Sequence, residues 1–226
     1  MADTLGPAAP YPVAYDVAPQ LHGRNRLTVL FRLFLAIPQL ILVGGPGLVL
    51  GGGLAWRFPA NGDWTWGVHW GGGGVLGAVA FVMAIIAWFA ILVANTHPRG
   101  LWDFACFYMS WRARAIAYIA LLRDEYPPFG DGAYPAHFAV SHPDGPRNKW
   151  SVALRIVYVI PQAIVLFFLG IAWCITAVIA WFAILFTGSY PEPLYRFAVG
   201  YLRWSLRVES YLLLLRDEYP PFSFEA

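Results

Sequence analysis

The chain has 226 residues, of which 59% are hydrophobic and only 12% are charged, and its mean hydropathy is +0.55. Soluble domains carry about 25% charged residues, so this composition argues against a soluble domain and indicates a membrane protein. The formal net charge of +2 is too small to indicate nucleic-acid binding. Three stretches without Asp, Glu, Lys or Arg exceed the about 20 residues that a bilayer span needs. They cover residues 33–56, 64–98 and 156–191.

The chain contains an internal duplication. Residues 123–129, Arg-Asp-Glu-Tyr-Pro-Pro-Phe, recur unchanged at 216–222 with an offset of 93. Nearer the N-terminus the offset is 123, which pairs Ile-Pro-Gln at 37–39 with the same residues at 160–162. The first copy therefore carries an insertion of about 30 residues between the two registers. We predict a tail at 1–10, a first copy at 11–129 with its insertion at 44–74, a linker at 130–133, a second copy at 134–222 and a tail at 223–226.

Each copy begins with the alternation that is typical of a β-strand. Aromatic or apolar side chains occupy every second position over residues 11–17 and again over 134–140. Pro12 and Pro135 allow only an edge strand or a strand start. We predict that the two strands pair in a small cytoplasmic ribbon that joins the copies.

The apolar segment after each strand is expected to form a transmembrane helical hairpin. In the first copy the insertion would be the turn of this hairpin. In the second copy the turn would fall at 168–171, where Gly170 can relax the backbone. The alternative is one long tilted or kinked helix after Pro161, which would make the two copies inverted, as in some transporters.

The positive charges favour one orientation of these hairpins. All Lys and Arg residues except Arg57 lie at the start of a copy or in its last helical segment and flanks. The positive-inside rule then identifies that side as cytoplasmic, with both chain termini on it. Four tryptophans of the insertion are expected in the belt at the outer interface: Trp56, Trp64, Trp66 and Trp70.

The last helix of each copy is expected to lie in the membrane interface. Three charges near the middle of 194–215 cost about 8 to 10 kcal/mol in a bilayer, against about 3 to 5 kcal/mol from its apolar residues. On a helix the arginines of this segment form a polar stripe along one face. The stripe contains Arg196, Arg203 and Arg207, and the first copy has Arg112 and Arg114 in the corresponding region.

Two interpretations of this stripe remain open. One is a solvated or headgroup-facing edge that only anchors the helix. The other is a set of arginines that binds the phosphate groups of anionic lipid or of a lipid-linked substrate. The predicted headgroup-binding residues are Arg32, Arg155, Arg112, Arg114, Arg196, Arg203 and Arg207.

The repeated acidic endings follow helices that proline must terminate. Their carboxylates oppose the helix dipole and need basic partners, for which Arg123 and Arg216 are candidates. Paired carboxylates can also serve acid–base chemistry or hold a metal, but their duplication favours a structural joint. The predicted structural residues are Asp124, Glu125, Tyr126, Asp217, Glu218 and Tyr219; no catalytic, metal or cofactor site is predicted.

The motifs at 180–191 and 202–222, together with the Tyr-Pro strands and the Ile-Pro-Gln helix starts, resemble a bacterial membrane-protein family of the actinobacterial type. That family is catalogued as a domain of unknown function, so the resemblance implies residence in the bacterial inner membrane and no activity. The predicted fold class is an all-α membrane protein of two tandem repeats. Each repeat would contain a short strand, a transmembrane helical hairpin and an amphipathic interfacial helix.

The sequence predicts a non-catalytic role rather than an enzyme. The expected function is the binding of anionic lipid, or a membrane scaffold, through an arginine-striped cytoplasmic face. A membrane-protein partner or a second copy of the chain is a further expected partner, and nucleic acid is not. The alternative function is a small transporter or channel subunit with a path between the two repeats.

Overall fold

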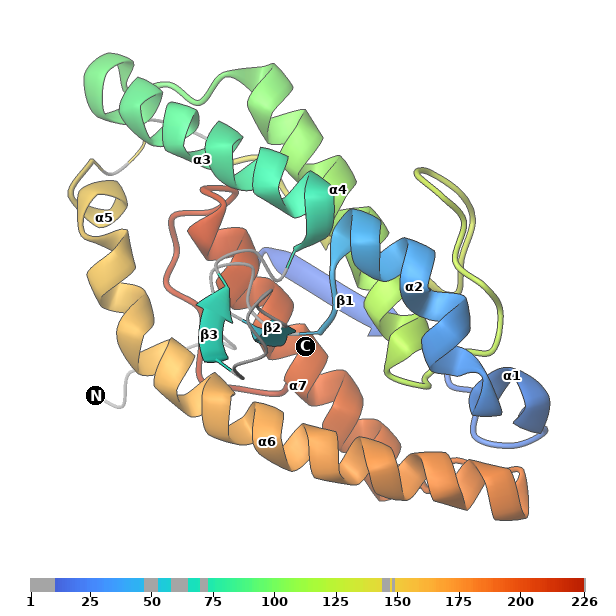
Figure 1. Ribbon diagram of the computed structural model, residues 1–226. Helices are drawn as coiled ribbons and strands as arrows, with labels where there is room; N and C mark the ends of the chain where they lie inside the picture. The colour runs from blue at the N-terminus through green and yellow to red at the C-terminus, as the bar shows by residue number, and fades with distance from the viewer. Residues whose placement is uncertain are drawn as a thin grey trace, which may run out of the picture.

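The computed structural model describes residues 11–46, 53–57, 65–69, 73–143, 147 and 149–225, and most of them are helical (Figure 1). The first copy supplies β1 (Val13–Val17), α1 (Arg26–Leu30), α2 (Arg32–Val43), β2 (Gly53–Arg57), β3 (Thr65–His69), α3 (Gly74–Ala94) and α4 (Arg99–Ile119). The second copy supplies β4 (Ala136–Val140), α5 (Lys149–Ala153), α6 (Arg155–Thr187) and α7 (Glu192–Leu212). The predicted tail at 1–10 and the side chains of the four tryptophans in the insertion lie outside this description.

The second copy has one continuous helix where the sequence predicts a hairpin. α6 runs uninterrupted over 33 residues, which is about 50 Å at 1.5 Å per residue. The hairpin prediction is therefore wrong, and the alternative of one long helix is confirmed. Gly170 lies inside α6, where an added Cβ would be 3.0 Å from the hydroxyl of Tyr201. This glycine allows α7 to approach α6 closely and does not reverse the chain.

The first copy has the corresponding helix in two pieces. α3 continues in the general direction of α2 (Figure 1). The two pieces meet at Gly44 and Gly74, because a Cβ on Gly74, whose φ is +67°, would lie 2.7 Å from the Gly44 amide nitrogen. Between them β2 and β3 pair antiparallel, with Gly53 opposite His69. The membrane hairpin predicted for this copy is also wrong, because the described part of the insertion contains two antiparallel strands between the two pieces of a broken helix.

The predicted pairing of one strand from each copy is confirmed, while the cytoplasmic placement of this ribbon stays a prediction. β1 pairs antiparallel with β4, with Val13 opposite Val140 and Val17 opposite Ala136. Along β1 buried and exposed residues alternate strictly, and Asp16 points outward. This alternation is the burial pattern of a strand with one covered face.

The two copies exchange contacts across the molecule. β1 packs on α7 and β4 packs on α4, while α1 packs on α6 and α5 packs on α3. Two hydrogen bonds mark this exchange: the indole of Trp181 donates to the Val29 carbonyl at 3.0 Å, and that of Trp88 to the Val152 carbonyl at 2.9 Å. Each copy therefore supplies the elements that cover the other.

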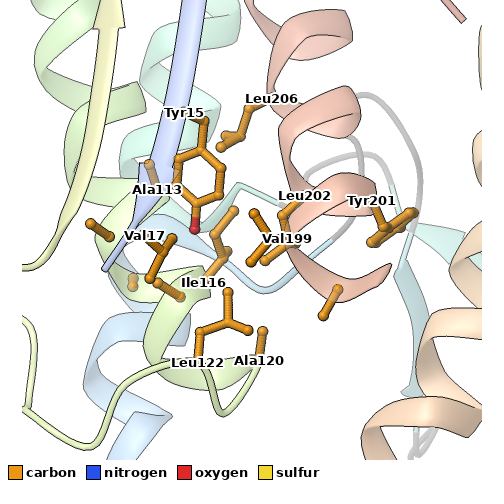
Figure 2. Packing of buried hydrophobic residues seen from close by; sticks show 14 of the residues in the cluster. Tyr15, Val17, Ala113, Ile116, Ala120, Leu122, Val199, Tyr201, Leu202 and Leu206 are labelled. Atoms are coloured by element: carbon orange, nitrogen blue, oxygen red, sulfur yellow. The ribbon is translucent and has the colours of Figure 1, made fainter. Parts of the chain in front are cut away.

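Helices α4 and α7 form the centre of the core. Figure 2 shows Tyr15 of β1 close to Ile116 of α4 and to Leu202 and Leu206 of α7. All four side chains are buried. The prediction that these helices lie in the membrane interface, with their apolar faces in lipid, is therefore wrong. Their apolar faces pack against α6, against α2 and α3, and against each other.

The long helices form an apolar outer surface instead. Within the described part of the chain, α3 and α6 are each long and apolar enough to cross a membrane, by length and composition. Only 22% of the apolar window of α3 and 17% of that of α6 is buried. Core helices of soluble proteins are mostly buried, so this exposure distinguishes the two helices from them.

Candidate functional site

An aspartate held by two arginines closes the first copy. Arg24 donates to both carboxylate oxygens of Asp124, at 2.7 and 3.0 Å, and Arg32 donates to one of them at 2.7 Å. The guanidinium of Arg32 also lies over the ring of Tyr118, 4.0 Å from its centroid. These residues join the start of α1 and α2 to the end of α4. We call this group the first clasp.

The second copy repeats the arrangement as the second clasp. Arg147 and Arg155 both donate to Asp217, at 2.8 and 2.7 Å. Arg155 lies over the ring of Tyr211 at 4.2 Å and donates to the Tyr211 carbonyl. Each clasp thus contains two guanidinium groups and one carboxylate. Each clasp therefore has one net positive charge, which a negatively charged ligand would complement.

Backbone strain is stored next to each clasp. Leu121 and Leu214 adopt left-handed φ angles of 62° and 64°, a conformation that costs roughly 1–2 kcal/mol for a residue with a Cβ. Their carbonyls accept hydrogen bonds from Arg24 at 2.6 Å and Arg147 at 2.7 Å. Hydrogen bonds to charged groups contribute about 1.5–3 kcal/mol, which offsets this strain.

The environment of the first clasp keeps its carboxylate ionised. Burial alone would raise the pKa of Asp124, but hydrogen bonds from Arg24 and the Asn25 amide, with the charges of Arg24 and Arg32, lower it below the usual 3.8. A carboxylate held in this way is a poor proton acceptor. The clasp therefore suits a structural joint or an anion-binding surface and does not suit acid–base catalysis.

In each copy the repeated ending forms a hydrogen bond with a glutamine of the long helix. Gln39 accepts from the indole of Trp111 at 2.8 Å and donates to the Pro127 carbonyl at 3.0 Å. Gln162 does the same with Trp204 and the Pro220 carbonyl, both at 2.7 Å. The first proline of each Pro-Pro pair thus accepts a hydrogen bond from the glutamine of the Ile-Pro-Gln segment in the same copy.

The remaining residues of the acidic endings have local partners, as predicted for a joint. Glu125 pairs with Arg123 at 2.6 Å, and Glu218 pairs with Arg216 at 2.5 Å. The rings of Tyr126 and Tyr219 pack edge-on against Tyr118 and Tyr211. All six predicted structural residues therefore lie in or beside a clasp.

A buried ion pair connects α4 to α7 at the centre. Arg112 donates to both carboxylate oxygens of Glu209 at 2.9 Å, and each side chain is 1% exposed. Arg112 also donates to the Val43 carbonyl at 2.7 Å, at the end of α2. This pair has no counterpart by offset, because Ser205 and Ile116 occupy the corresponding positions.

The predicted arginine stripe of α7 faces protein along most of its length. Arg203 donates to the Tyr15 carbonyl of β1 and to the Phe224 carbonyl, both at 2.9 Å. Arg207 is buried near the Val13 carbonyl, and Arg114 of α4 donates to the Gly130 carbonyl. Among the predicted headgroup-binding residues, Arg196 has the most exposed side chain, at 77%. A headgroup role for these arginines stays a prediction.

A cavity of about 290 Å³ lies between α3 and the start of α6, and we call it the α3–α6 cavity. Its wall is apolar, with Phe81, Ile85 and Phe89 from α3 and Leu213 from the turn after α7. Within the described part of the chain, Arg155 of the second clasp is the one charged residue that lines it. The cavity therefore joins the outer apolar surface to a buried guanidinium.

The structure brings Arg32 and Arg155 into the two clasps and places them apart from the stripe. Sequence reasoning did not assign Arg24, Arg147, Gln39 or Gln162 to a site. A signal was present, because each of these residues recurs at the offset of 123 that relates the starts of the two copies. When a polar residue occurs at the same position of both copies, in or next to an apolar helix, we expect that its side chain binds a partner inside the fold.

Comparisons with known proteins agree with a duplicated unit. No curated protein and no solved structure matches the chain. A family model matches it twice, over residues 69–130 and 149–223, which together are more than half of its length. The chain therefore belongs to the family described as a domain of unknown function, DUF4389, and contains two copies of that domain.

Proposed function

We propose that this protein is a non-catalytic membrane protein of the bacterial cytoplasmic membrane, of the actinobacterial type, which binds anionic lipid or acts as a membrane scaffold. The observation that supports this proposal is the outer surface of α6. Large apolar side chains are exposed along its whole length, from Ile156 at 72% through Phe168 at 65% to Phe186 at 76%. Contiguous apolar surface of this kind marks an interaction site, and a bilayer fits this surface because the one charged residue of α6, Arg155, is buried.

The position of the ribbon favours helices that lie along the membrane. Arg203, at the middle of α7, is 3.9 Å from Asp16 of β1, whose side chain is 83% exposed. The same part of α7 packs on the middle of α6, where Tyr201 stacks on Trp173. An upright α6 would place this carboxylate and the open ribbon edges at the bilayer centre, which is costly. If α6 lies in the membrane plane, the ribbon faces water.

Exposed basic residues support the same orientation. Arg26 and Arg196 lie near the end of α6, and Arg99 and Lys149 lie near the end of α3. Crossing helices would put two of these cations on each side of the membrane, against the positive-inside rule. Helices embedded lengthwise in one leaflet put all four at the same headgroup layer, where anionic lipids attract cations.

Transport is the second candidate function. The two long helices run in opposite directions, which is an arrangement of inverted repeats. The crossing of α4 and α7 is filled by the buried pair of Arg112 and Glu209, and this packing argues against a path there. The multi-pass topology with cytoplasmic termini that the sequence predicts for either function requires crossing helices, and it stays a prediction.

Spin labels along α6 test the orientation. Single cysteines replace Ile156, Phe168 and Phe186 in a background with Cys106→Ala and Cys174→Ala, and collision with oxygen and a nickel chelate reports depth in vesicles. We expect similar depths at all three positions. A maximum at Phe168, with shallow ends, would establish crossing helices instead.

Flotation of the purified protein with vesicles tests lipid binding. Vesicles of phosphatidylcholine with phosphatidylglycerol should carry more protein to the top of the gradient than phosphatidylcholine alone. Arg26→Gln with Lys149→Gln should reduce this difference, while Asp16→Asn should not, because Asp16 faces water away from the bilayer. A wild-type protein that stays at the bottom of both gradients would refute membrane residence.

A further inference from the structure

The α3–α6 cavity has an opening on the surface that the proposed function assigns to lipid. Phe81, Ile85 and Phe89 line it from α3 and are 39%, 43% and 58% exposed. Ile156 of α6 forms the facing rim and is 72% exposed. An alkyl chain in the leaflet can therefore enter the cavity without crossing water.

The chemistry inside the cavity is apolar except at one point. Its volume of about 290 Å³ is near the lower limit of small-molecule sites. Arg155, which is 2% exposed, is the single charged residue among the described residues that line the cavity. A ligand that matches this wall has an apolar body with one anionic group.

Arg155 retains binding capacity within its clasp. Its two terminal nitrogens donate to the Tyr211 carbonyl and to Asp217, but its buried Nε has no hydrogen-bond partner among the residues that the structure describes. Arg147 shares the same aspartate, so the second clasp has two positive charges for one negative charge. A buried donor without an acceptor costs about 1–3 kcal/mol, and an anionic oxygen would remove that cost.

We propose that the α3–α6 cavity binds one alkyl chain of an anionic amphiphile, whose phosphate or carboxylate oxygen accepts from Arg155. This inference rests on the proposed function, because the chain enters from the membrane. Phospholipid and free fatty acid share the required chemistry. The site selects a ligand with an anionic head group and holds one apolar chain of that ligand inside the protein.

Tryptophan substitutions in the cavity test the proposal. Ala84 lines the cavity, and Ala84→Trp fills it. Ile86→Trp is the matched control, because Ile86 lies on the same helix, is 53% exposed and does not line the cavity. Native mass spectrometry of protein released from vesicles of phosphatidylglycerol and phosphatidylcholine counts the retained lipid. We expect wild type and Ile86→Trp to retain one phosphatidylglycerol, and Ala84→Trp to lose about tenfold in occupancy.

Ile85→Trp, which narrows the mouth, provides a second variant if Ala84→Trp does not fold. If wild type retains phosphatidylglycerol and the folded cavity variants retain as much of it, the proposal is overturned.

Two soluble probes identify the anionic group and the source of the chain. Dodecanoate should bind to the detergent-solubilised protein about tenfold more tightly than dodecanol, and cavity variants should lose this preference. Retention of phosphatidylglycerol identifies a phospholipid, whereas binding of dodecanoate without it identifies a fatty acid. Equal affinity for dodecanol and dodecanoate would overturn the role of Arg155.

Vesicle flotation separates this proposal from the one on which it rests. Ala84→Trp should float with vesicles as wild type does, because its outer surface is unchanged. If wild type does not float, the proposed membrane function fails. If both proteins float and both retain the same lipid, only the cavity proposal fails.

Discussion

The long helix is broken in the first copy and continuous in the second, and the break explains the asymmetric centre of the molecule. Where α2 stops, the Val43 carbonyl loses its partner in the helix and accepts from Arg112. The continuous α6 leaves no such carbonyl, and Ser205 stands where Arg112 would be. The buried ion pair therefore depends on the insertion, because the break in the helix provides the carbonyl that Arg112 binds.

The clasps show the opposite behaviour, since they are alike in both copies. Arg32 and Arg155 are each 2.7 Å from an aspartate oxygen, and each lies over a tyrosine ring. A feature kept in both copies serves the repeated unit, while one found in a single copy serves the insertion.

The largest expected effect follows from Glu209→Gln. This change leaves the Arg112 charge buried without its carboxylate, and breaking a buried ion pair costs about 3–5 kcal/mol. Thermal unfolding in detergent should show a large loss of stability. Glu192→Gln is the control, because its pair with Arg196 is exposed and exposed pairs contribute about 0–1 kcal/mol. Equal losses in both variants would contradict the central role of the pair.

The next effect compares the two clasps. Asp124→Asn and Asp217→Asn should each cost roughly 3 kcal/mol, because each leaves two buried arginines without a carboxylate. Asp124 should cost more, since its side chain is 11% exposed against 21% for Asp217 and it also accepts from the Asn25 amide. Chemical unfolding of the two variants in the same detergent measures the difference. A loss in only one copy would show that the clasps are not equivalent.

Acid should weaken the first clasp through the same carboxylate. The pKa of Asp124 is lower in the folded chain than its usual 3.8. Its contribution is therefore fully present above the unfolded pKa and is lost as the pH falls below 3.8 through the folded value. The stability of wild type should show this loss when unfolding is measured from about pH 6 to about pH 2, a range that spans the titration of carboxylates. Asp124→Asn should lack this part of the dependence.

Deleting residues 45–74 should make the first copy resemble the second. Gly44 would then join Val75 at the position of Phe167 and Phe168, and a continuous helix would remove the Val43 carbonyl from Arg112. We expect a loss of about 1.5–3 kcal/mol, the contribution of a hydrogen bond to a charged group. Adding Arg112→Ser and Glu209→Ile, as in the corresponding positions, should restore stability. Equal unfolding temperatures for the two deletion variants would refute the link.

The smallest effect concerns the bonds exchanged between the copies. Trp181→Phe and Trp88→Phe each remove one indole donor from a carbonyl of the other copy. Each should cost about 1 kcal/mol, the net contribution of one hydrogen bond. The two losses should be equal within error in thermal unfolding. A loss confined to Trp88→Phe would indicate that the broken helix depends more strongly on its neighbour.

The repeat, the ribbon and the apolar helices could be predicted from the sequence. Identical segments at one offset fix the duplication, and alternation around Tyr15 fixes the strand. These are local or periodic signals, so they need no knowledge of the packing. The expectation that the acidic endings form a joint followed from their position after a helix, and Asp124 and Asp217 lie in such joints.

The packing could not be predicted in the same way. Gly170 reads as a turn in a sequence, but its missing side chain admits Tyr201. The arginines of α7 suggest a headgroup face because an isolated helix has no other partner for them. In the fold Arg203 and Arg207 reach carbonyls of β1, which is separated from α7 by almost the whole chain. Contacts between residues that are so far apart in the chain cannot be predicted from a local sequence pattern.

The exchange of strands and short helices has a consequence for a single copy on its own. A chain of residues 134–226 would expose the face of β4 and the end of α6 that the other copy normally covers. Two such chains could cover each other through the same contacts, as a symmetric homodimer. The present gene would then be a fusion of two subunits, in which a covalent linker fixes a stoichiometry that an ancestor reached by association.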